Sequence, residues 1–204
     1  MNSIALVTSS DQVSGHANHQ GKAPKLQSSQ GFDLLQCYAF FMQNTTIEIS
    51  KEYLHFAAAH FTLFSDTERE NLHGHNFQVT LDAEAAIAED GLTFDYNILK
   101  KALKQMCDEL DEQVIMPTQS PHLQIESDDQ YTYAIFNGER IPFLERDLTL
   151  LPIRNVTVEE LAHYLLATLI EREEIKVLDI QNMVLRCASG EGQWASASWS
   201  CETV

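Results

Sequence analysis

Two histidines separated by one residue form the most informative short segment of this sequence. Residues 72–76 read Leu-His-Gly-His-Asn. In a β-strand, residues two apart point to the same side, so His73 and His75 would present two imidazoles on one face, roughly 7 Å apart at Cα. Such a pair is typical of a metal site, although surface or packing histidines produce the same pattern.

A third histidine, His60, ends the preceding strand-like segment. If the two segments pair as a hairpin, His60 falls near His73 and His75. Three neutral imidazoles suit Zn²⁺, and three protein ligands with one open position are the arrangement of a catalytic zinc rather than a structural one. The sequence therefore predicts a zinc site on these three residues. The other histidines lack a matching partner and are not expected to bind the ion: His16, His19, His55, His122 and His163.

Alternating apolar and polar residues predict a strand on each side of this site. Within residues 45–61, Ile49 and Tyr53 fall on the same side, and residues 75–84 alternate in the same way. The polar stretch 62–72 between them is predicted to be a loop.

Two amphipathic helices and two further strands follow. Apolar residues recur at spacings of three and four within 94–110 and within 158–173, and Thr157 begins a capping box before the second helix. Residues 177–187 and 193–201 alternate as strands. This order predicts an α+β fold, with a four-stranded antiparallel sheet and two helices on one face.

Weakly alternating segments between the two helices predict an inserted β meander at about 113–155, within a domain spanning 45–204. Residues 1 to about 30 are rich in Ser, Gln, His, Asn and Gly without an apolar period, and residues 32–42 are more apolar and ambiguous. The whole stretch 1–44 is predicted to be a disordered tail. The sequence leaves open whether the functional chain starts at Met1 or Met42.

The formal net charge of −17 argues against a nucleic-acid partner and against anionic membrane surfaces. A bound divalent cation would still allow a negatively charged small substrate. No apolar run approaches a membrane span, and no secretory signal is recognisable at the N-terminus. The scattered cysteines are therefore expected to be reduced thiols in the cytoplasm.

Several motifs, in order along residues 45–199, resemble the 6-pyruvoyl tetrahydropterin synthase and 6-carboxytetrahydropterin synthase family. They are Phe56-Ala57-Ala58-Ala59-His60, Leu72-His73-Gly74-His75-Asn76-Phe77, Thr93-Phe94-Asp95-Tyr96-Asn97, Leu110-Asp111 and Thr157-Val158-Glu159-Glu160-Leu161-Ala162. The resemblance implies a tunnelling fold (T-fold), homotrimers or homohexamers with active sites between subunits, and bound zinc. It also implies a substrate such as 7,8-dihydroneopterin triphosphate.

The resemblance also indicates which residues do the chemistry. The family usually carries a catalytic cysteine in the loop before the histidine pair, and this chain has none there. Glu70, three residues before His73, instead resembles a variant branch known from the malaria parasite, in which a glutamate replaces the cysteine and the side chain is cleaved to give a 6-hydroxymethyl pterin. Glu70 is therefore the predicted base; the alternative is a solvated loop charge, and Glu68 beside it could be either.

Three further positions match the family pattern less completely. Asp111 lacks the histidine that usually follows it, so it either supports catalysis or ends the helix. Thr157 and Glu159 match a substrate-contacting helix start, although Thr157 is also a helix cap. Ser189 stands where the family has a pterin-binding glutamate, and Glu191 is the candidate to replace it from the following turn.

Three functions remain in competition. The first is a zinc-dependent pterin synthase or lyase of the glutamate variant. The second is a 6-carboxytetrahydropterin synthase, against which the missing cysteine and histidine count. The third is a non-catalytic zinc-binding T-fold protein with a different ligand.

Overall fold

The computed structural model describes residues 44–201. The predicted tail lies almost wholly outside this range, so its disorder and the choice between Met1 and Met42 stay predictions. Thirteen elements follow one another along the chain: β1 Asn44–His60, β2 His73–Ala86, α2 Asn97–Leu110, β3 Gln113–Pro117, β4 Gln124–Ser127, β5 Thr132–Phe136, β6 Glu139–Phe143, η1 Glu145–Asp147, β7 Leu148–Leu151, α3 Val158–Ile170, α4 Glu173–Lys176, β8 Ile180–Gly190 and β9 Gln193–Ser200.

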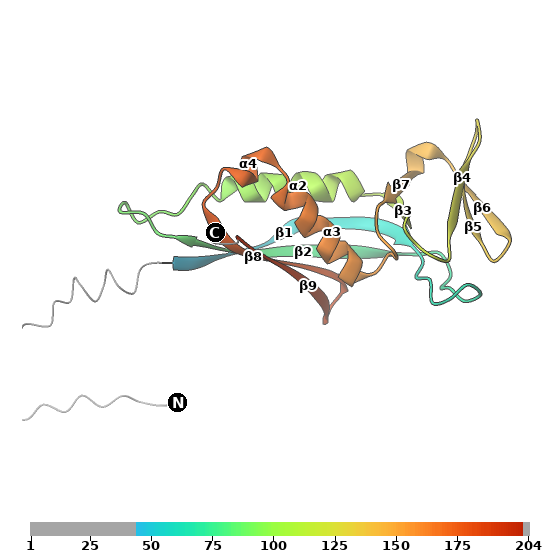
Figure 1. Ribbon diagram of the computed structural model, residues 1–204, viewed down its shortest axis with the longest axis horizontal. Coiled ribbons are helices and arrows are strands. Elements are labelled where there is room, and N and C mark those ends of the chain that lie inside the picture. The colour runs from blue at the N-terminus through green and yellow to red at the C-terminus, as the bar shows by residue number, and fades with distance from the viewer. Residues whose placement is uncertain (1–43, 202–204) are drawn as a thin grey trace, which may run out of the picture. The chain divides into compact units, whose positions relative to one another are not determined.

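The main sheet has six strands in the order β7-β3-β1-β2-β8-β9. Strands β1, β2, β8 and β9 pair antiparallel, as predicted. Two short strands from the insert, β3 and β7, extend the sheet through parallel pairs that were not predicted. Their sequences are short apolar runs without alternation, and parallel partners lie far apart in the chain, so periodicity alone does not reveal them. Figure 1 shows helices α2, α3 and α4 on one face of this sheet.

A bulge in β1 changes which side chains face the helices. The register shifts between Ser50 and His55, so four residues of β1 oppose a single residue of β2. Ile49 is buried before the bulge and Leu54 after it, whereas Tyr53 is 43% exposed. The prediction that Tyr53 continues the apolar side of the strand is therefore wrong, because the bulge shifts the inward positions from odd to even numbers.

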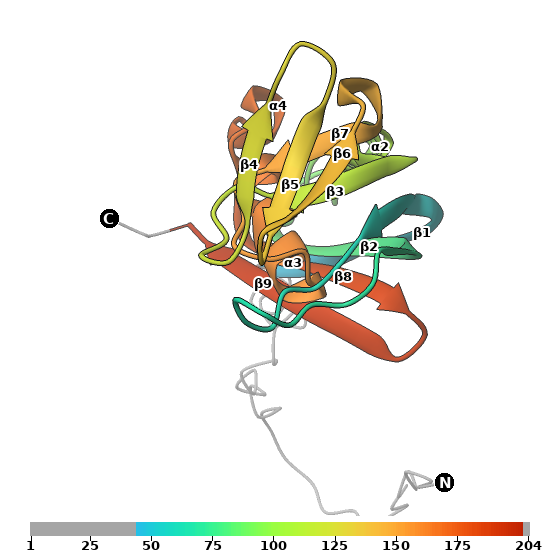
Figure 2. The same cartoon turned by 90° about the vertical axis from the view of Figure 1, so that its right-hand side faces the viewer.

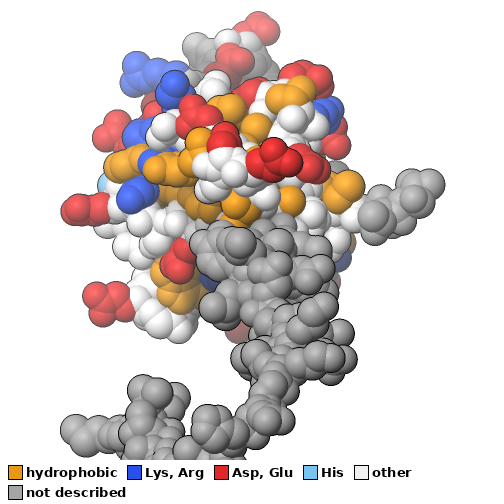
Figure 3. All heavy atoms as spheres, turned by 90° about the vertical axis from the view of Figure 1, so that its left-hand side faces the viewer, with side chains coloured by type: hydrophobic (Ala, Val, Ile, Leu, Met, Phe, Trp, Pro, Cys, Tyr) orange, Lys and Arg blue, Asp and Glu red, His pale blue; other side chains and the backbone are white. Residues whose placement is uncertain are grey.

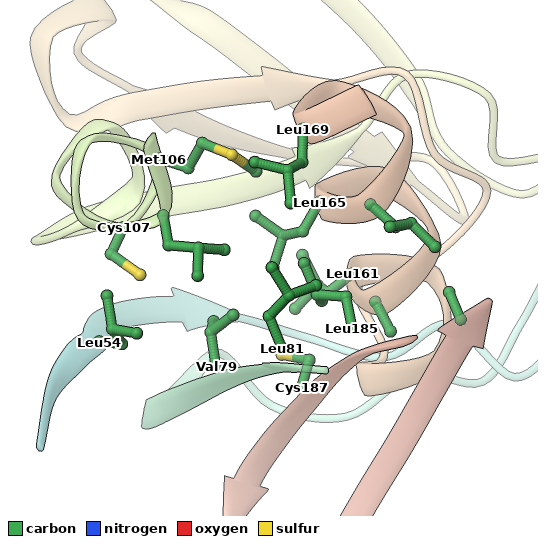
Figure 4. Close-up of a cluster of buried hydrophobic side chains, with 14 of the residues drawn as sticks. Leu54, Val79, Leu81, Met106, Cys107, Leu161, Leu165, Leu169, Leu185 and Cys187 are labelled. Atoms are coloured by element: carbon green, nitrogen blue, oxygen red, sulfur yellow. The ribbon is translucent and has the colours of Figure 1, made fainter. Parts of the chain in front are cut away.

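The core lies between the sheet and the two long helices. In Figure 4 leucine and valine side chains from β1, β2 and β8 face apolar residues of α2 and α3. The labelled members are Leu54, Val79, Leu81, Met106, Cys107, Leu161, Leu165, Leu169, Leu185 and Cys187. Burial of this interface fixes the helices on the sheet, and therefore fixes where α3 begins.

Both helices are shorter than predicted. Helix α2 begins at Asn97 because the Asp95 carboxylate accepts the Asn97 N–H at 3.0 Å in a turn that precedes the helix. Helix α3 ends at Ile170, and the separate turn α4 takes up residues 173–176.

The insert forms the predicted meander as a separate three-stranded sheet, β4-β5-β6 (Figure 2). Its β5–β6 connection uses Asn137 and Gly138, both at positive φ, which suits a tight hairpin turn. One side of this sheet packs on a second apolar cluster that includes Phe61 and Leu63 from the segment after β1. The insert therefore contacts the loop that joins β1 to β2.

None of the helices described within residues 44–201 is long and apolar enough to cross a membrane. On the part of the face in Figure 3 that grey atoms do not cover, acidic side chains lie beside basic and hydrophobic ones.

Replacing Leu81 with alanine tests the assignment of the core. Leu81 is fully buried, so Leu81→Ala should lower the free energy of unfolding by about 2–5 kcal/mol. Leu92, which is 66% exposed, provides the control, and Leu92→Ala should stay within about 0.5 kcal/mol of the parent. Urea unfolding of the three proteins measures the difference, and equal midpoints for the two variants would contradict the assignment.

Candidate metal centre and its pocket

Strand pairing brings the three predicted histidines together. His60 is directly opposite His73 in the β1–β2 ladder, and His75 is opposite Ala58. All three side chains lie on the helix-covered face, since they continue the inward positions of Phe56 on β1 and Phe77 on β2. The ring centroids are 4.7, 5.3 and 4.8 Å apart, and one nitrogen from each ring lies within 4.8 Å of the others.

His60 is held in its neutral form. The residue is only 5% exposed. Burial, together with the neighbouring His73 and His75, lowers the pKa of His60 to about 4. Neither ring nitrogen of His60 has a hydrogen-bond partner among the described residues. A buried imidazole with two unpaired nitrogens costs stability unless a ligand uses one of them.

The other two rings, those of His73 and His75, bring their Nε2 atoms close together. His73 Nδ1 lies 2.8 Å from the Asn71 carbonyl oxygen, so this nitrogen donates its proton and leaves the Nε2 lone pair free. His73 Nε2 and His75 Nε2 are 3.0 Å apart. Zn–N bonds of about 2.0–2.1 Å in a tetrahedral site would separate ligand nitrogens by roughly 3.3 Å. The His73–His75 separation therefore fits a small divalent metal ion, and a His60 nitrogen lies within 4.8 Å of the other two.

The histidines face a cavity of about 570 Å³. Its wall is built by the ends of β1 and β2, the loop between these strands, the start of α3 and the β8–β9 hairpin. The lining residues are His60, Thr62, Glu70, His73, His75, Phe77, Val156, Thr157, Val158, Glu159, Ser189, Gln193 and Trp194. A metal ion held by three imidazoles would therefore have its open position toward a space large enough for a bicyclic ligand.

Glu70 lies beside the histidines and is held by its own loop. Its Oε2 accepts the Thr62 N–H at 3.0 Å, and its own N–H donates to the Thr62 carbonyl at 2.9 Å. The same Oε2 is 4.0 Å from His73 Nε2. Partial burial raises the pKa of Glu70, but the hydrogen bonds from Thr62 and the nearby His73 and His60 more than offset this, so the pKa lies below its usual value. Glu70 is thus a carboxylate in the cavity wall.

The start of α3 forms another part of the wall. Thr157 is the N-cap, and its side chain accepts the Glu160 N–H at 3.4 Å. In a complete capping box the Glu160 carboxylate would accept the Thr157 N–H. Here it instead accepts the backbone N–H and a guanidinium N–H of Arg154. Thr157 and Glu159 both line the cavity, next to the positive end of the helix dipole.

Two of the predicted site residues, Glu191 and Asp111, do not line this cavity. Glu191 is in the exposed turn after β8 and does not line the cavity, although Ser189 does. The Asp111 carboxylate accepts the Ala57 N–H at 2.7 Å, which ties the end of α2 to β1. Its position supports the helix-ending role within a single chain.

Gln193 and Trp194 are among the lining residues that sequence reasoning missed. They follow the β8–β9 turn, and Trp194 pairs with Ala188 across the hairpin. Trp194 is 45% exposed. Its proximity to the histidines depends on the order β1-β2-β8-β9 in the sheet, so no local signal marks it.

Comparisons with known proteins find related sequences and structures. Residues 48–196 match the family described as 6-pyruvoyl tetrahydropterin synthase. A putative 6-carboxy-5,6,7,8-tetrahydropterin synthase of Methanocaldococcus jannaschii is 31% identical over 131 residues, which cover 64% of this chain and 78% of that protein.

Solved structures show the same fold. The crystal structure of 6-pyruvoyl tetrahydropterin synthase from Plasmodium vivax has a TM-score of 0.72 and 28% identity, and the match covers 78% of this chain and 99% of that one. A variant of that enzyme, in which a glutamate described as a catalytic residue is replaced by alanine, gives the same values. The α+β T-fold expected from the sequence is therefore confirmed.

The burial of His60 predicts a pH dependence for the metal-free protein. The pKa of His60 falls from 6.5 to about 4 on folding, so between these pH values the unfolded chain binds more protons at this residue than the folded chain. Stability is therefore retained above pH 6.5 and lost as the pH falls toward 4, by up to about 3 kcal/mol. Urea unfolding in the presence of a chelator measures this loss.

His60→Asn is the control for this prediction. The variant removes the titrating group and should flatten the dependence relative to the parent protein over the same pH range. An equal pH dependence in the two proteins would contradict the assignment of this loss to His60.

Proposed function

Because the chain belongs to the 6-pyruvoyl tetrahydropterin synthase family, we propose that it is a zinc-dependent pterin synthase or lyase. The substrate would be 7,8-dihydroneopterin triphosphate or a related dihydropterin, from which the enzyme removes triphosphate or cleaves the side chain. One observation carries this proposal: His60, His73 and His75 converge in the wall of a cavity that also contains the Glu70 carboxylate.

His60, His73 and His75 would hold the zinc ion through one ring nitrogen each. When bound, zinc supplies Lewis-acid polarisation of a substrate oxygen and so acidifies protons on the neighbouring carbon. Two features of the chain favour metal binding. Burial keeps His60 neutral, and the hydrogen bond to the Asn71 carbonyl fixes the tautomer of His73. Neutral imidazoles with an oriented lone pair are the form that binds the ion.

Glu70 is the proposed base, which removes a substrate proton and returns it. The lowered pKa keeps the carboxylate ionised while making it a weaker base than a free glutamate, and the Thr62 N–H binds one carboxylate oxygen, Oε2. The catalytic glutamate of the Plasmodium vivax enzyme supports this assignment by similarity.

The remaining cavity residues suit a flat heterocycle. Trp194 offers apolar surface, while Thr157 and Glu159 add polar groups at the start of α3. We propose Thr157 and Glu159 as substrate contacts. Glu191 lies outside the cavity of a single chain, as does Asp111, so their proposed roles depend on an adjacent copy in the homotrimer or homohexamer that we also propose.

A second activity is favoured by the archaeal relative, which is described as a putative 6-carboxytetrahydropterin synthase. Both activities use the same class of dihydropterin substrate and would require the same histidines. A non-catalytic protein that binds another ligand is the third candidate, favoured by Ser189 at the position of the expected pterin-binding glutamate.

Product analysis separates these functions. The zinc-loaded full-length chain is incubated with 7,8-dihydroneopterin triphosphate, and the products are identified by mass spectrometry. We expect a 6-pyruvoyl or a 6-hydroxymethyl pterin, whose formation stops on chelation and resumes on adding zinc. A 6-carboxy product would establish the second activity, and unchanged substrate in the presence of zinc would contradict the enzyme proposal.

Replacing Glu70 with glutamine tests the base. Glu70→Gln keeps the size of the side chain but cannot take up a proton, so kcat should fall about 10²- to 10⁴-fold while zinc content stays the same. Glu68→Gln in the same loop is the matched control and should remain within about twofold of the parent. Steady-state kinetics with metal analysis decide the outcome, and an unchanged kcat in Glu70→Gln would remove Glu70 from the chemistry.

A further inference from the structure

The side chain next to Glu70 in sequence is held between two aromatic rings from different parts of the chain. The Arg69 guanidinium carbon lies 4.7 Å from the ring centroid of Phe61, which directly follows β1. It also lies 5.7 Å from the ring centroid of Phe136, at the end of β5 in the insert. Attraction between the cation and both ring faces fixes the position of Arg69.

Arg69 also holds the backbone that carries the proposed base. Its Nη1 donates to the Glu70 carbonyl oxygen at 2.7 Å. The same loop is closed by the Leu63–Arg69 bridge, by the Glu70 N–H donating to the Thr62 carbonyl, and by the Thr62 N–H donating to the Glu70 carboxylate. Arg69 therefore connects the Glu70 backbone directly to the insert.

A second contact holds the opposite side of the loop. The Asn155 side chain accepts the Leu63 N–H at 3.1 Å and donates to the Leu63 carbonyl at 2.8 Å. Asn155 thus acts as a strand partner for one residue of the loop. The Leu63 side chain is 5% exposed and packs in the apolar cluster that the insert shares with Phe61.

The tip of the loop has no such support. Residues 66–68 are exposed, and the Phe64 side chain is 59% exposed. The conformation at Glu70 therefore depends on the base of the loop, where Arg69 and Leu63 contact the insert and the segment before α3.

We propose that Arg69, whose guanidinium lies over the Phe61 ring and over the Phe136 ring of the insert, is a positioning residue for Glu70. The insert would then serve as the support that holds the carboxylate against the histidine site. This inference rests on the proposed function, because it takes Glu70 as the base.

The chain provides a matched control for this inference. Arg140 is also in the insert. Its guanidinium carbon lies 4.2 Å from the ring centroid of Tyr133, and its Nη1 lies 3.6 Å from Glu126 Oε2. Arg140→Met therefore removes an arginine–aromatic contact from the same insert without affecting the Glu70 loop.

Kinetics of three variants test the positioning role. Arg69→Met should lower kcat about 10- to 100-fold with little change in KM and with full zinc content, since the histidines remain in place. Arg69→Lys, which keeps a cation and a donor, should recover part of the loss. Arg140→Met should match the parent, and an Arg69→Met protein that also matches it would overturn the inference.

Hydrogen exchange of the zinc-loaded chain provides a readout that needs no substrate. The Thr62 and Glu70 amides should exchange roughly 10-fold faster in Arg69→Met, but not in Arg140→Met, while the amides of β2 keep their protection. If the parent has no pterin activity, the proposed function fails while this measurement still decides the positioning role. Unchanged exchange in Arg69→Met would overturn that role.

Phe136→Leu provides an independent variant if Arg69→Met does not fold. It removes the ring on the insert side and leaves the guanidinium in place. It should accelerate exchange of the same two amides, and unchanged exchange would count against the insert as the support.

Discussion

Antiparallel pairing of β1 with β2 is the constraint on which the rest of the site depends. It sets His60 opposite His73 and brings His75 next to them, all on the helix-covered face. The bulge in β1 belongs to the same constraint, because it lets Ile49 and Leu54 both point into the core although they are five residues apart. A strand without the bulge would have to expose one of these segments.

Burial then determines the chemistry of the histidines. His60 lies at the edge of the core, where a charged imidazole is unfavourable, so the residue stays neutral and its nitrogens lack partners. The same burial that would destabilise a metal-free protein in acid makes the site suitable for a metal ion. The start of α3 and the β8–β9 hairpin complete the cavity, since packing of α3 on the sheet fixes both relative to the histidines.

The insert extends the main sheet and also contacts the loop that carries Glu70. It adds β3 and β7 to the sheet and forms its own apolar cluster against the loop after β1. The loop that carries Glu70 has an exposed tip at residues 66–68. The contacts of Arg69 and Asn155 supply long-range support from both sides.

Several features could be predicted from local pattern in the sequence. The spacing of His73 and His75, the alternation of β2, the apolar stripe of α3 and its Thr157 cap all follow from strand and helix geometry. Which distant residues meet depends on the three-dimensional packing: Trp194 and Gln193 line the cavity, Glu191 does not, and the Asp111 carboxylate accepts the Ala57 N–H. The parallel strands β3 and β7 belong to this second group. These contacts depend on strand order and helix packing, which join residues far apart in the chain and leave no periodic trace in the sequence.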